Sequence, residues 1–286
     1  MEYATFGRAG MKASRIGVGT YYDPLFILSA ALLRFRRGRR EKVAAIRRAL
    51  ELGINLIDTA ELYRTEDLVA EAIEGFRRDE VLICGKVWPS HLRYEAVLKA
   101  CEASLRRLRT SYLDLYLVHW PNPRVPLSET MRALERLVDE GKVRAIGVSN
   151  FSAEQVRSAQ EALSKHELTA VQVEYSLLER RAEQELLPLC RKENLALMAY
   201  RPLAHGLLSQ PTGALGKALR AVAAKYKKTA AQVALNWLLS KDERIFPIPR
   251  ASRPARVEEN AGGAGWRLQP QDLEGLEGAL ARAQGA

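Results

Sequence analysis

Short apolar runs rich in Val, Ile and Leu alternate along the chain with longer segments whose apolar residues recur every three or four positions. The first pattern is typical of buried parallel strands, and the second of amphipathic helices that cover a sheet. The expected strands are Ser14 to Val18, Ile54 to Asp58, Val81 to Lys86, Leu113 to His119, Ala145 to Ser149, Ala170 to Glu174, Ala196 to Tyr200 and Arg244 to Ile248.

Helices are expected between these strands, with Gly53 and Gly141 just past two of them. The strands are apolar on both faces, the β-α order continues to the end, and no Gly-x-Gly-x-x-Gly motif opens a helix after the first strand. These features favour a (β/α)8 TIM barrel over an open Rossmann sheet. The helices expected most clearly are Glu41 to Leu52, Tyr94 to Leu108, Glu129 to Glu140 and Ala230 to Leu239.

The two ends of the chain add smaller elements to the barrel. Two short apolar runs joined around Gly7 to Gly10 predict an N-terminal β-hairpin, and Gln269 to Leu280 predicts a C-terminal helix. No linker interrupts the pattern, so residues 1–286 are expected to form one domain.

The total charge leaves several classes of ligand open, and the positions of the basic residues narrow the choice. The 286 residues carry 44 basic and 34 acidic side chains, a net charge of +10, which alone leaves nucleic acid, anionic membranes and phosphorylated ligands open. Most of the excess lies in two stretches that contain no acidic residue. They contribute Arg34, Arg36, Arg37, Arg39 and Arg40 in the first, and Arg250, Arg253 and Arg256 in the second.

Cysteine and histidine usage argues against a disulfide framework or a metal site. Three widely spaced cysteines and four scattered histidines form no CxxC or Cys/His pattern. The longest uncharged apolar run, Pro24 to Leu33, is too short to span a bilayer, and the N-terminus lacks an apolar core with a cleavage site. We therefore expect a reduced, cytoplasmic, unexported protein that binds no metal and no membrane.

Candidate chemistry gathers where the expected strands end, because reactive groups of such barrels lie at the C-terminal ends of strands. Asp58, Lys86 and His119 each end a strand, and Tyr63 follows shortly after the first. Taken singly, each has an ordinary role as a helix cap, a solvated strand end, a semi-buried histidine or loop packing.

Together the four residues fit the reduction of a carbonyl. A tyrosine, whose usual pKa is about 10, donates a proton near neutrality only if its phenolate is stabilised. An adjacent Lys86 cation would stabilise it, Asp58 would hold that lysine, and a neutral His119 would orient the carbonyl oxygen. The set lacks only a source of hydride.

The residues around these positions resemble the signature motifs of the aldo-keto reductases. The resemblance runs from Phe6 to Leu280. It rests on Asp58-Thr59-Ala60-Glu61-Leu62-Tyr63, Gly85-Lys86-Val87-Trp88, His119-Trp120-Pro121, Gly17-Val18-Gly19-Thr20, Gly147-Val148-Ser149-Asn150-Phe151, Gln172-Val173-Glu174-Tyr175-Ser176 and Ile248-Pro249-Arg250 through Glu259-Asn260.

The resemblance implies a (β/α)8 barrel that reduces aldehydes or ketones with NADP(H), with Tyr63 as the general acid, Lys86 and Asp58 as its tuning pair and His119 as the carbonyl-orienting residue. Ser149, Asn150 and Gln172 would hold the carboxamide, and Tyr175 would stack beneath the nicotinamide. The implied cofactor-binding set is Gly19, Thr20, Asp58, Ser149, Asn150, Gln172, Tyr175, Arg201, Leu203, Arg250, Arg256, Glu259 and Asn260.

Arginines at the family's adenosine 2′-phosphate position favour NADP(H) over NAD(H), because guanidinium groups pair strongly with a dianion. Arg250 and Arg256 match basic family positions, whereas Arg253 is an additional charge. Arg201 departs from the Ser usual in the family, and either pairs with the pyrophosphate or points away. Ala251 stands where a hydroxyl residue is frequent.

The resemblance also places the substrate pocket. Tyr21, Trp88 and Trp120 are its expected aromatic walls, and the short tail after Trp266 predicts an open pocket with broad carbonyl acceptance. The segment Tyr21 to Arg40, which follows the first expected strand, is either an amphipathic helix with a solvated Arg face or a lid that attracts anionic substrates. Nucleic acid is not an expected partner, because no aromatic residues interleave with the arginines.

Two other classes of function remain open on the sequence. One is a non-catalytic NADP(H)-binding sensor or auxiliary subunit on the same barrel. The other is a different barrel enzyme, a metal hydrolase or a phosphate-sugar isomerase, which the scattered histidines support poorly. The expected partner is a small carbonyl substrate, and the expected oligomeric state is a monomer.

Overall fold

The computed structural model describes residues 1–22, 25–27 and 38–284. Its main sheet has eight parallel strands that follow one another in sequence order, as the alternation of apolar runs predicts. They are β3 (Val18–Gly19), β4 (Leu56–Asp58), β5 (Leu82–Val87), β6 (Leu115–Val118), β7 (Ile146–Ser149), β8 (Leu168–Glu174), β9 (Ala196–Tyr200) and β10 (Ile245–Pro247).

The first and last strands of this sheet meet and close it. The backbone N–H of Gly17 donates to Pro247 O at 2.9 Å, and Gly19 N–H donates to Pro249 O at 3.1 Å. A Cβ on Gly19 would lie 2.9 Å from Ile248 O, so the close approach of the two strands requires glycine there. The predicted (β/α)8 barrel is confirmed.

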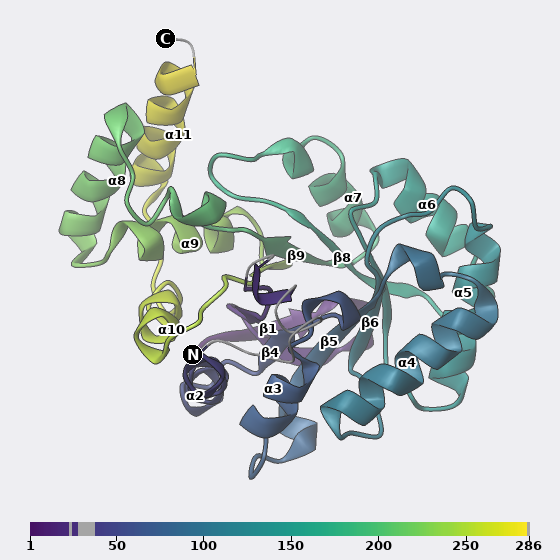
Figure 1. The fold of residues 1–286 in the computed structure, drawn as a ribbon. Helices are drawn as coiled ribbons and strands as arrows, with labels where there is room; N and C mark the ends of the chain where they lie inside the picture. The colour runs from purple at the N-terminus through teal and green to yellow at the C-terminus, as the bar shows by residue number, and fades with distance from the viewer. Residues whose placement is uncertain (23–24, 28–37, 285–286) are drawn as a thin grey trace.

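Helices surround the sheet, and the pair α8 and α11 packs together beside it, with the C-terminus at the tip of α11 (Figure 1). The helices expected most clearly from sequence all form, with ends shifted by a few residues, and both Gly53 and Gly141 have the positive φ of a helix terminus. The helices are α2 (Arg39–Glu51), α3 (Glu66–Ala72), α4 (Tyr94–Leu108), α5 (Leu127–Asp139), α6 (Ala153–Glu161), α7 (Leu186–Lys192), α8 (Gly213–Tyr226), α9 (Ala230–Lys241), α10 (Pro254–Ala261) and α11 (Pro270–Gln284).

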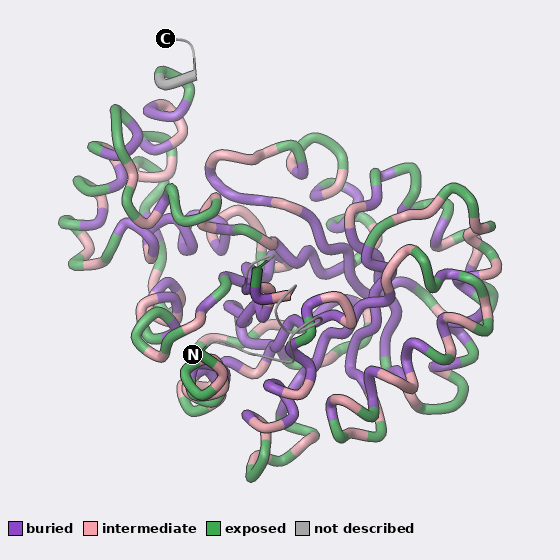
Figure 2. Tube along the Cα trace, viewed as in Figure 1, coloured by how far each residue is buried: buried purple, intermediate pink, exposed green. Residues whose placement is uncertain are grey.

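Successive residues of each strand belong to two different apolar layers. Leu82 and Cys84 of β5 join a small cluster enclosed by the sheet, whereas Ile83 and Val87 join the large cluster between sheet and helices. Buried positions accordingly run along the strands, and exposed ones lie on the outer sides of the helices (Figure 2). Because Lys86 continues the alternation of Leu82 and Cys84, its side chain falls on the enclosed face.

An N-terminal hairpin packs against this enclosed layer, as predicted. It pairs β1 (Tyr3–Phe6) with β2 (Met11–Ser14), and Phe6 joins the enclosed cluster. The turn residue Gly7 has φ +55°, and a Cβ there would come within 2.2 Å of Thr169 O. The hairpin therefore depends on glycine to lie against the start of β8.

The expected first barrel strand, Ser14 to Val18, is wrong in its boundaries. Ser14 pairs with Tyr3 in the hairpin, and only Val18 belongs to β3. The hydroxyl of Ser14 donates to Ile16 O at 2.8 Å, and Arg15 N–H donates back to Glu2 O at 2.9 Å. These bonds turn the chain between two strands that a single apolar run had joined.

Most of the segment Tyr21 to Arg40, including Arg34, Arg36 and Arg37, lies outside the described residues. Both interpretations of that segment therefore stay predictions. Arg39 is described: it begins α2 and pairs with Asp67 of α3 at 2.6 Å. In the described part of the chain, no helix has the length and apolar character needed to cross a bilayer.

Candidate active site

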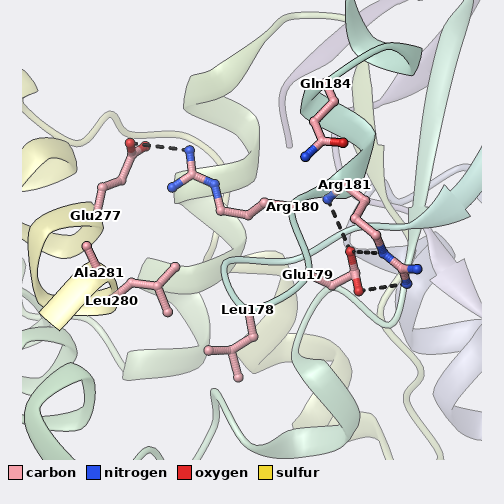
Figure 3. A pocket seen from close by; sticks show the side chains of 8 residues that line it. All are labelled: Leu178, Glu179, Arg180, Arg181, Gln184, Glu277, Leu280 and Ala281. Atoms are coloured by element: carbon pink, nitrogen blue, oxygen red, sulfur yellow. Dashed lines mark hydrogen bonds and ion pairs between the residues drawn. The ribbon is translucent and has the colours of Figure 1, made fainter. Parts of the chain in front are cut away.

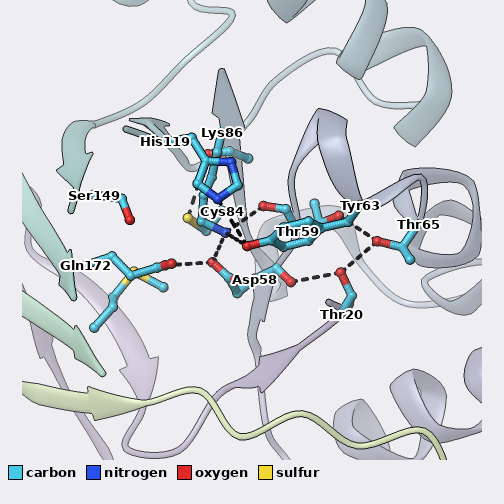
Figure 4. A network of polar contacts seen from close by, with 12 residues as sticks. Thr20, Asp58, Thr59, Tyr63, Thr65, Cys84, Lys86, His119, Ser149 and Gln172 are labelled. Atoms are coloured by element: carbon cyan, nitrogen blue, oxygen red, sulfur yellow. Dashed lines mark hydrogen bonds and ion pairs between the residues drawn. The ribbon is translucent and has the colours of Figure 1, made fainter. Parts of the chain in front are cut away.

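Three neighbouring strands deliver polar side chains to one end of the barrel, as the sequence predicts. Asp58 ends β4, Lys86 lies near the end of β5, and His119 directly follows β6. Tyr63 comes from the 3-10 helix Glu61–Tyr63 in the loop after β4. The structure brings all four together in one buried network (Figure 4).

Lys86 stands at the centre of the network and is fully buried. Its ammonium pairs with Asp58 Oδ1 at 2.6 Å, donates to Thr59 O at 2.9 Å and contacts Tyr63 Oη at 3.4 Å. Burial alone lowers the pKa of this ammonium, but attraction to Asp58 and Tyr63 outweighs burial and raises the pKa above its usual value. Lys86 is therefore a cation, with all three of its protons directed at oxygen atoms.

The Tyr63 hydroxyl lies between two catalytic candidates. It is 3.4 Å from Lys86 Nζ and 3.3 Å from His119 Nε2. Burial, the largest influence, raises the pKa of Tyr63 to about 12, and Lys86 acts in the opposite direction. The effect of Lys86 has the expected direction, but burial outweighs it, so the phenol keeps its proton at neutral pH.

His119 is a neutral imidazole here. Burial and the neighbouring Lys86 cation lower the pKa of His119 to about 2. Its Nδ1 is buried and has no hydrogen-bond partner among the described residues. Since an unpaired lone pair is commoner in buried sites than an unpaired N–H, we place the ring proton on Nε2, beside Tyr63.

Three further predicted residues border this network. Gln172 of β8 donates from Nε2 to Asp58 Oδ1 at 2.7 Å. Asn150 donates from Nδ2 to His119 O at 2.9 Å and to Ser149 Oγ at 3.1 Å. The strands β7 and β8 thus extend the polar surface beyond the catalytic four.

Three threonine hydroxyls form a hydrogen-bonded chain next to Asp58, which the sequence analysis did not predict. The N–H and the hydroxyl of Thr20 both donate to Asp58 O at 3.0 Å. Thr65 Oγ1 lies 2.8 Å from Thr20 Oγ1 and 3.2 Å from Thr59 Oγ1. Thr20 is fully buried in these contacts, which fix the end of β4.

The assignment of Tyr175 as a stacking ring is not supported by the structure and needs correction. Its side chain is 0% exposed. The ring packs edge-on against Trp237, and the hydroxyl donates to Glu183 at 3.0 Å. No surface of this ring remains for a ligand, because helix α9 covers it.

Tyr200 is the residue that sequence reasoning missed. It ends β9, is only partly buried, and donates from its hydroxyl to Asn150 Oδ1 at 2.8 Å. The same rule that selected Asp58 and Lys86, a polar side chain at the end of a strand, would have found it. Its ring is partly exposed beside Asn150, with the Arg201 guanidinium 5.7 Å from its centroid, whereas the ring of Tyr175 is fully buried.

Arg201 and Leu203 follow Tyr200 and take different positions. Arg201 pairs with Glu174 at 3.0 Å and has a positive φ of 49°. Leu203 is half-buried and packs against a small apolar cluster that includes Ile16. Of the two alternatives for Arg201, the structure shows the side chain held by a carboxylate of this chain.

The arginines of the second basic stretch lie around the start of α10, each with a partner. Arg250 donates from Nη1 to Tyr22 O, and Arg256 pairs with Glu259 at 2.6 Å. Arg253 pairs with Glu41 of α2 at 3.3 Å. Near them Asn260 is buried, as is Ala251.

Aromatic residues flank the catalytic network on two sides. The Tyr21 ring packs edge-to-face on Tyr63 with centroids 5.2 Å apart, and Trp88 packs in the same way on His119, also at 5.2 Å. Trp120 is 44% exposed. The predicted walls Tyr21 and Trp88 therefore contact the catalytic residues directly.

A separate hollow of about 350 Å³ lies between the loop after β8 and helix α11 (Figure 3). Charged groups there are already paired: Arg180 with Glu277 at 3.3 Å, and Arg181 with Glu179 at 2.8 Å. None of the catalytic four lines it. Within the described ranges, no three His, Cys, Asp or Glu side chains are grouped as a metal would need.

The comparison with protein families agrees with this geometry. The sequence pattern of the Aldo/keto reductase family matches residues 36–281. This range includes the four candidate catalytic residues, Asp58, Tyr63, Lys86 and His119, and the arginines of the second basic stretch.

Individual relatives match over most of their length. The chain is 38% identical to the methylglyoxal reductase YeaE of Escherichia coli, covering 86% of this chain and 87% of that protein. It is 31% identical to the NADH-specific methylglyoxal reductase of the same species, covering 95% and 96%. An aldo/keto reductase from Klebsiella pneumoniae, solved with NADP and acetate, superposes with a TM-score of 0.85 at 35% identity, covering 96% of this chain and 94% of that one.

Proposed function

Since this chain belongs to the aldo/keto reductase family and is an NAD(P)H-dependent oxidoreductase that reduces carbonyl groups, we propose that NADPH is its hydride donor and that small aldehydes and dicarbonyls are its substrates. The observation that carries the proposal is the buried contact of a protonated Tyr63 with the Lys86 cation and the neutral His119. A non-catalytic binding protein has no need of such a set.

The residues of this chain then divide the chemistry among them. NADPH, when bound, supplies a hydride to the carbonyl carbon. His119 Nε2–H donates a hydrogen bond to the carbonyl oxygen and orients it. Tyr63 gives its phenolic proton to that oxygen as negative charge develops, and the Lys86 cation stabilises the phenolate that remains.

Two groups of residues fit the cofactor. We assign the nicotinamide to the surface formed by Tyr200, Ser149, Asn150 and Gln172, with Tyr200 in place of Tyr175 as the stacking ring. A planar ring whose hydroxyl is tied to Asn150 offers a fixed stacking face. Arg250 and Arg256 would hold the 2′-phosphate, and Glu259 and Asn260 the adenine.

The expected substrate size follows from the aromatic walls of the pocket and from the substrates named for two relatives. Tyr21 and Trp88 pack on the proposed catalytic side chains, while Trp120 is 44% exposed and is a less enclosing wall. Methylglyoxal, the substrate named for two relatives, is a small dicarbonyl. Hydrogen bonds from Tyr63 and His119 would be enough to bind it. Larger aromatic aldehydes would also contact the indole of Trp88.

The proposal is tested by following NADPH and NADH oxidation with methylglyoxal and with an aromatic aldehyde. We expect turnover with both carbonyls and a preference for NADPH. Tight NADPH binding without turnover of any carbonyl would instead favour the sensor. Absence of binding to either cofactor would refute the assigned cofactor surface.

We expect Arg256→Ala to weaken NADPH binding about 10- to 100-fold, because a charge-assisted contact to the phosphate is lost. NADH lacks that phosphate, so its dissociation constant should change by less than about threefold. Fluorescence quenching by each cofactor measures both. Arg250→Ala should act in the same direction.

Arg253→Ala is the matched control for this prediction. It removes a guanidinium from the same helix end, one that pairs with Glu41 of α2, whereas Arg256 pairs with Glu259, a proposed adenine contact. We expect its NADPH affinity to stay within about twofold of wild type. Equal losses of NADPH and NADH affinity in Arg256→Ala would contradict the 2′-phosphate assignment.

A further inference from the structure

Glu61 joins two loops at the mouth of the barrel. It begins the 3-10 helix Glu61–Tyr63 after β4, and its side chain is only 12% exposed. Its Oε1 accepts the backbone N–H of Trp88, and His91 Nδ1 lies 3.1 Å from both carboxylate oxygens. Both contacts reach the loop between β5 and α4, so one carboxylate links it to the loop that carries Tyr63.

The backbone N–H of Trp88 depends on this carboxylate. Trp88 comes directly after the last residue of β5, Val87, and among the described residues the Glu61 carboxylate is the acceptor found for its N–H. A bond from N–H to an ionised carboxylate is about twice as strong as one between neutral groups. Glu61 therefore fixes the backbone at the point where the chain leaves β5, and with it the orientation of the Trp88 indole.

A second hydrogen bond holds the same turn. Asn122, in the loop after β6, donates from Nδ2 to Pro89 O at 2.9 Å. Glu61 thus bonds to Trp88, and Asn122 bonds to the next residue, Pro89. The turn is fixed by two side chains from two different loops.

The consequence lies in the substrate pocket, because the Trp88 indole packs edge-to-face on the His119 ring. Small movements of the turn would displace the indole relative to the imidazole that orients the carbonyl. A small dicarbonyl meets mainly His119 and Tyr63, whereas an aromatic carbonyl also needs the indole in place.

We propose that Glu61 is a positioning residue that sets substrate preference by fixing Trp88 over His119, so that it decides how well bulky carbonyls bind relative to small ones. This inference rests on the proposed carbonyl reduction. Glu61 itself contacts neither Lys86 nor the Tyr63 hydroxyl in the structure, so it acts through Trp88.

The test compares KM and kcat for an aromatic aldehyde and for methylglyoxal in Glu61→Ala and Glu61→Gln. We expect Glu61→Ala to raise KM for the aromatic aldehyde about tenfold, because the charge-assisted hydrogen bond that holds Trp88 is lost. KM for methylglyoxal should rise by less than about threefold. Glu61→Gln keeps an oxygen acceptor for the Trp88 N–H and should stay near wild type. NADPH affinity should not change in either variant.

Glu129→Ala is the matched control. Glu129 of α5 also accepts a backbone N–H from another segment, that of Tyr94 at the start of α4 at 3.0 Å, and no hydrogen bond joins it to Trp88 among the described residues. Its loss should leave the ratio of the two KM values unchanged. A ratio shifted equally by Glu129→Ala and Glu61→Ala would show general loosening and overturn the proposal.

A double-variant cycle shows whether the effect passes through the indole. In a Trp88→Ala background, Glu61→Ala should add less than about twofold to KM for the aromatic aldehyde. An undiminished tenfold effect in that background would overturn the proposal. If Glu61→Ala does not fold, Asn122→Ala removes the second hydrogen bond to the same turn and should produce the same selective rise in KM.

Trp88 fluorescence gives a readout independent of activity. The difference between wild type and Trp88→Phe isolates the emission of this indole, and Glu61→Ala should shift that component to longer wavelength. An unshifted component would show that the turn does not need Glu61. A wild-type protein that reduces no carbonyl would refute the proposed function, while the fluorescence result would still decide whether Glu61 fixes Trp88.

Discussion

Tyr63→Phe is expected to lower kcat for carbonyl reduction by about 10²- to 10⁴-fold, the usual contribution of a general acid, while NADPH still binds. The substitution removes one hydroxyl and keeps the ring that packs on Tyr21 and His119. The lost contacts, 3.3 Å to His119 and 3.4 Å to Lys86, are long, so the fold should be as stable as wild type. Steady-state kinetics, cofactor titration and thermal unfolding measure the three quantities.

Tyr21→Phe controls for the loss of a hydroxyl in the same part of the pocket. The Tyr21 ring packs on Tyr63, and Lys86 directs its protons to other oxygen atoms. The loss of kcat in Tyr21→Phe should be less than about threefold. If Tyr63→Phe kept a tenth or more of the wild-type kcat, another group would have to supply the proton.

The pH dependence of reduction provides an independent check on the same residue. The pKa of Tyr63 is raised to about 12, so the phenol loses its proton only in strong alkali, and the pKa of His119 is lowered to about 2, so the imidazole stays neutral. Both groups are therefore in their active forms from about pH 6 to 9. We expect kcat/KM to be flat over that interval, and a limb near about pH 6.5 would contradict a neutral His119.

Lys86→Met is expected to remove most activity and to lower the free energy of unfolding by about 3 kcal/mol. Methionine approximates the lysine stem, but Asp58 then remains buried without its cation. Losing one partner of a buried pair costs more than losing both, because the remaining charge is unpaired and no longer hydrated. Urea denaturation and NADPH oxidation measure the two effects.

The double variant Asp58→Asn with Lys86→Met separates stability from chemistry. It removes the buried charge, so it should regain much of the lost stability, yet it should stay inactive because Tyr63 has no neighbouring cation. Lys142→Met, which breaks a solvent-accessible pair with Glu102, should leave both quantities unchanged. A Lys86→Met protein as stable as wild type would show that the buried pair contributes no net stability.

The sequence by itself determined the barrel and placed the four proposed catalytic residues, Asp58, Tyr63, Lys86 and His119, at one end of it. Strand periodicity and the absence of a Rossmann motif are local properties, and parallel strands place their carboxyl ends at one edge. Periodicity and strand order alone were therefore enough to locate Asp58, Lys86 and His119.

The tertiary structure decided what depends on neighbours distant in sequence. Tyr175 and Tyr200 both follow apolar runs, and only the packing of Trp237 on Tyr175 shows that this ring is the fully buried one. Arg253 turns to Glu41 of another helix, and Glu61 reaches the N–H of Trp88 across two loops. Periodicity shows that a side chain is buried, but not which distant residue covers it or bonds to it. That partner is decided only when separate segments meet.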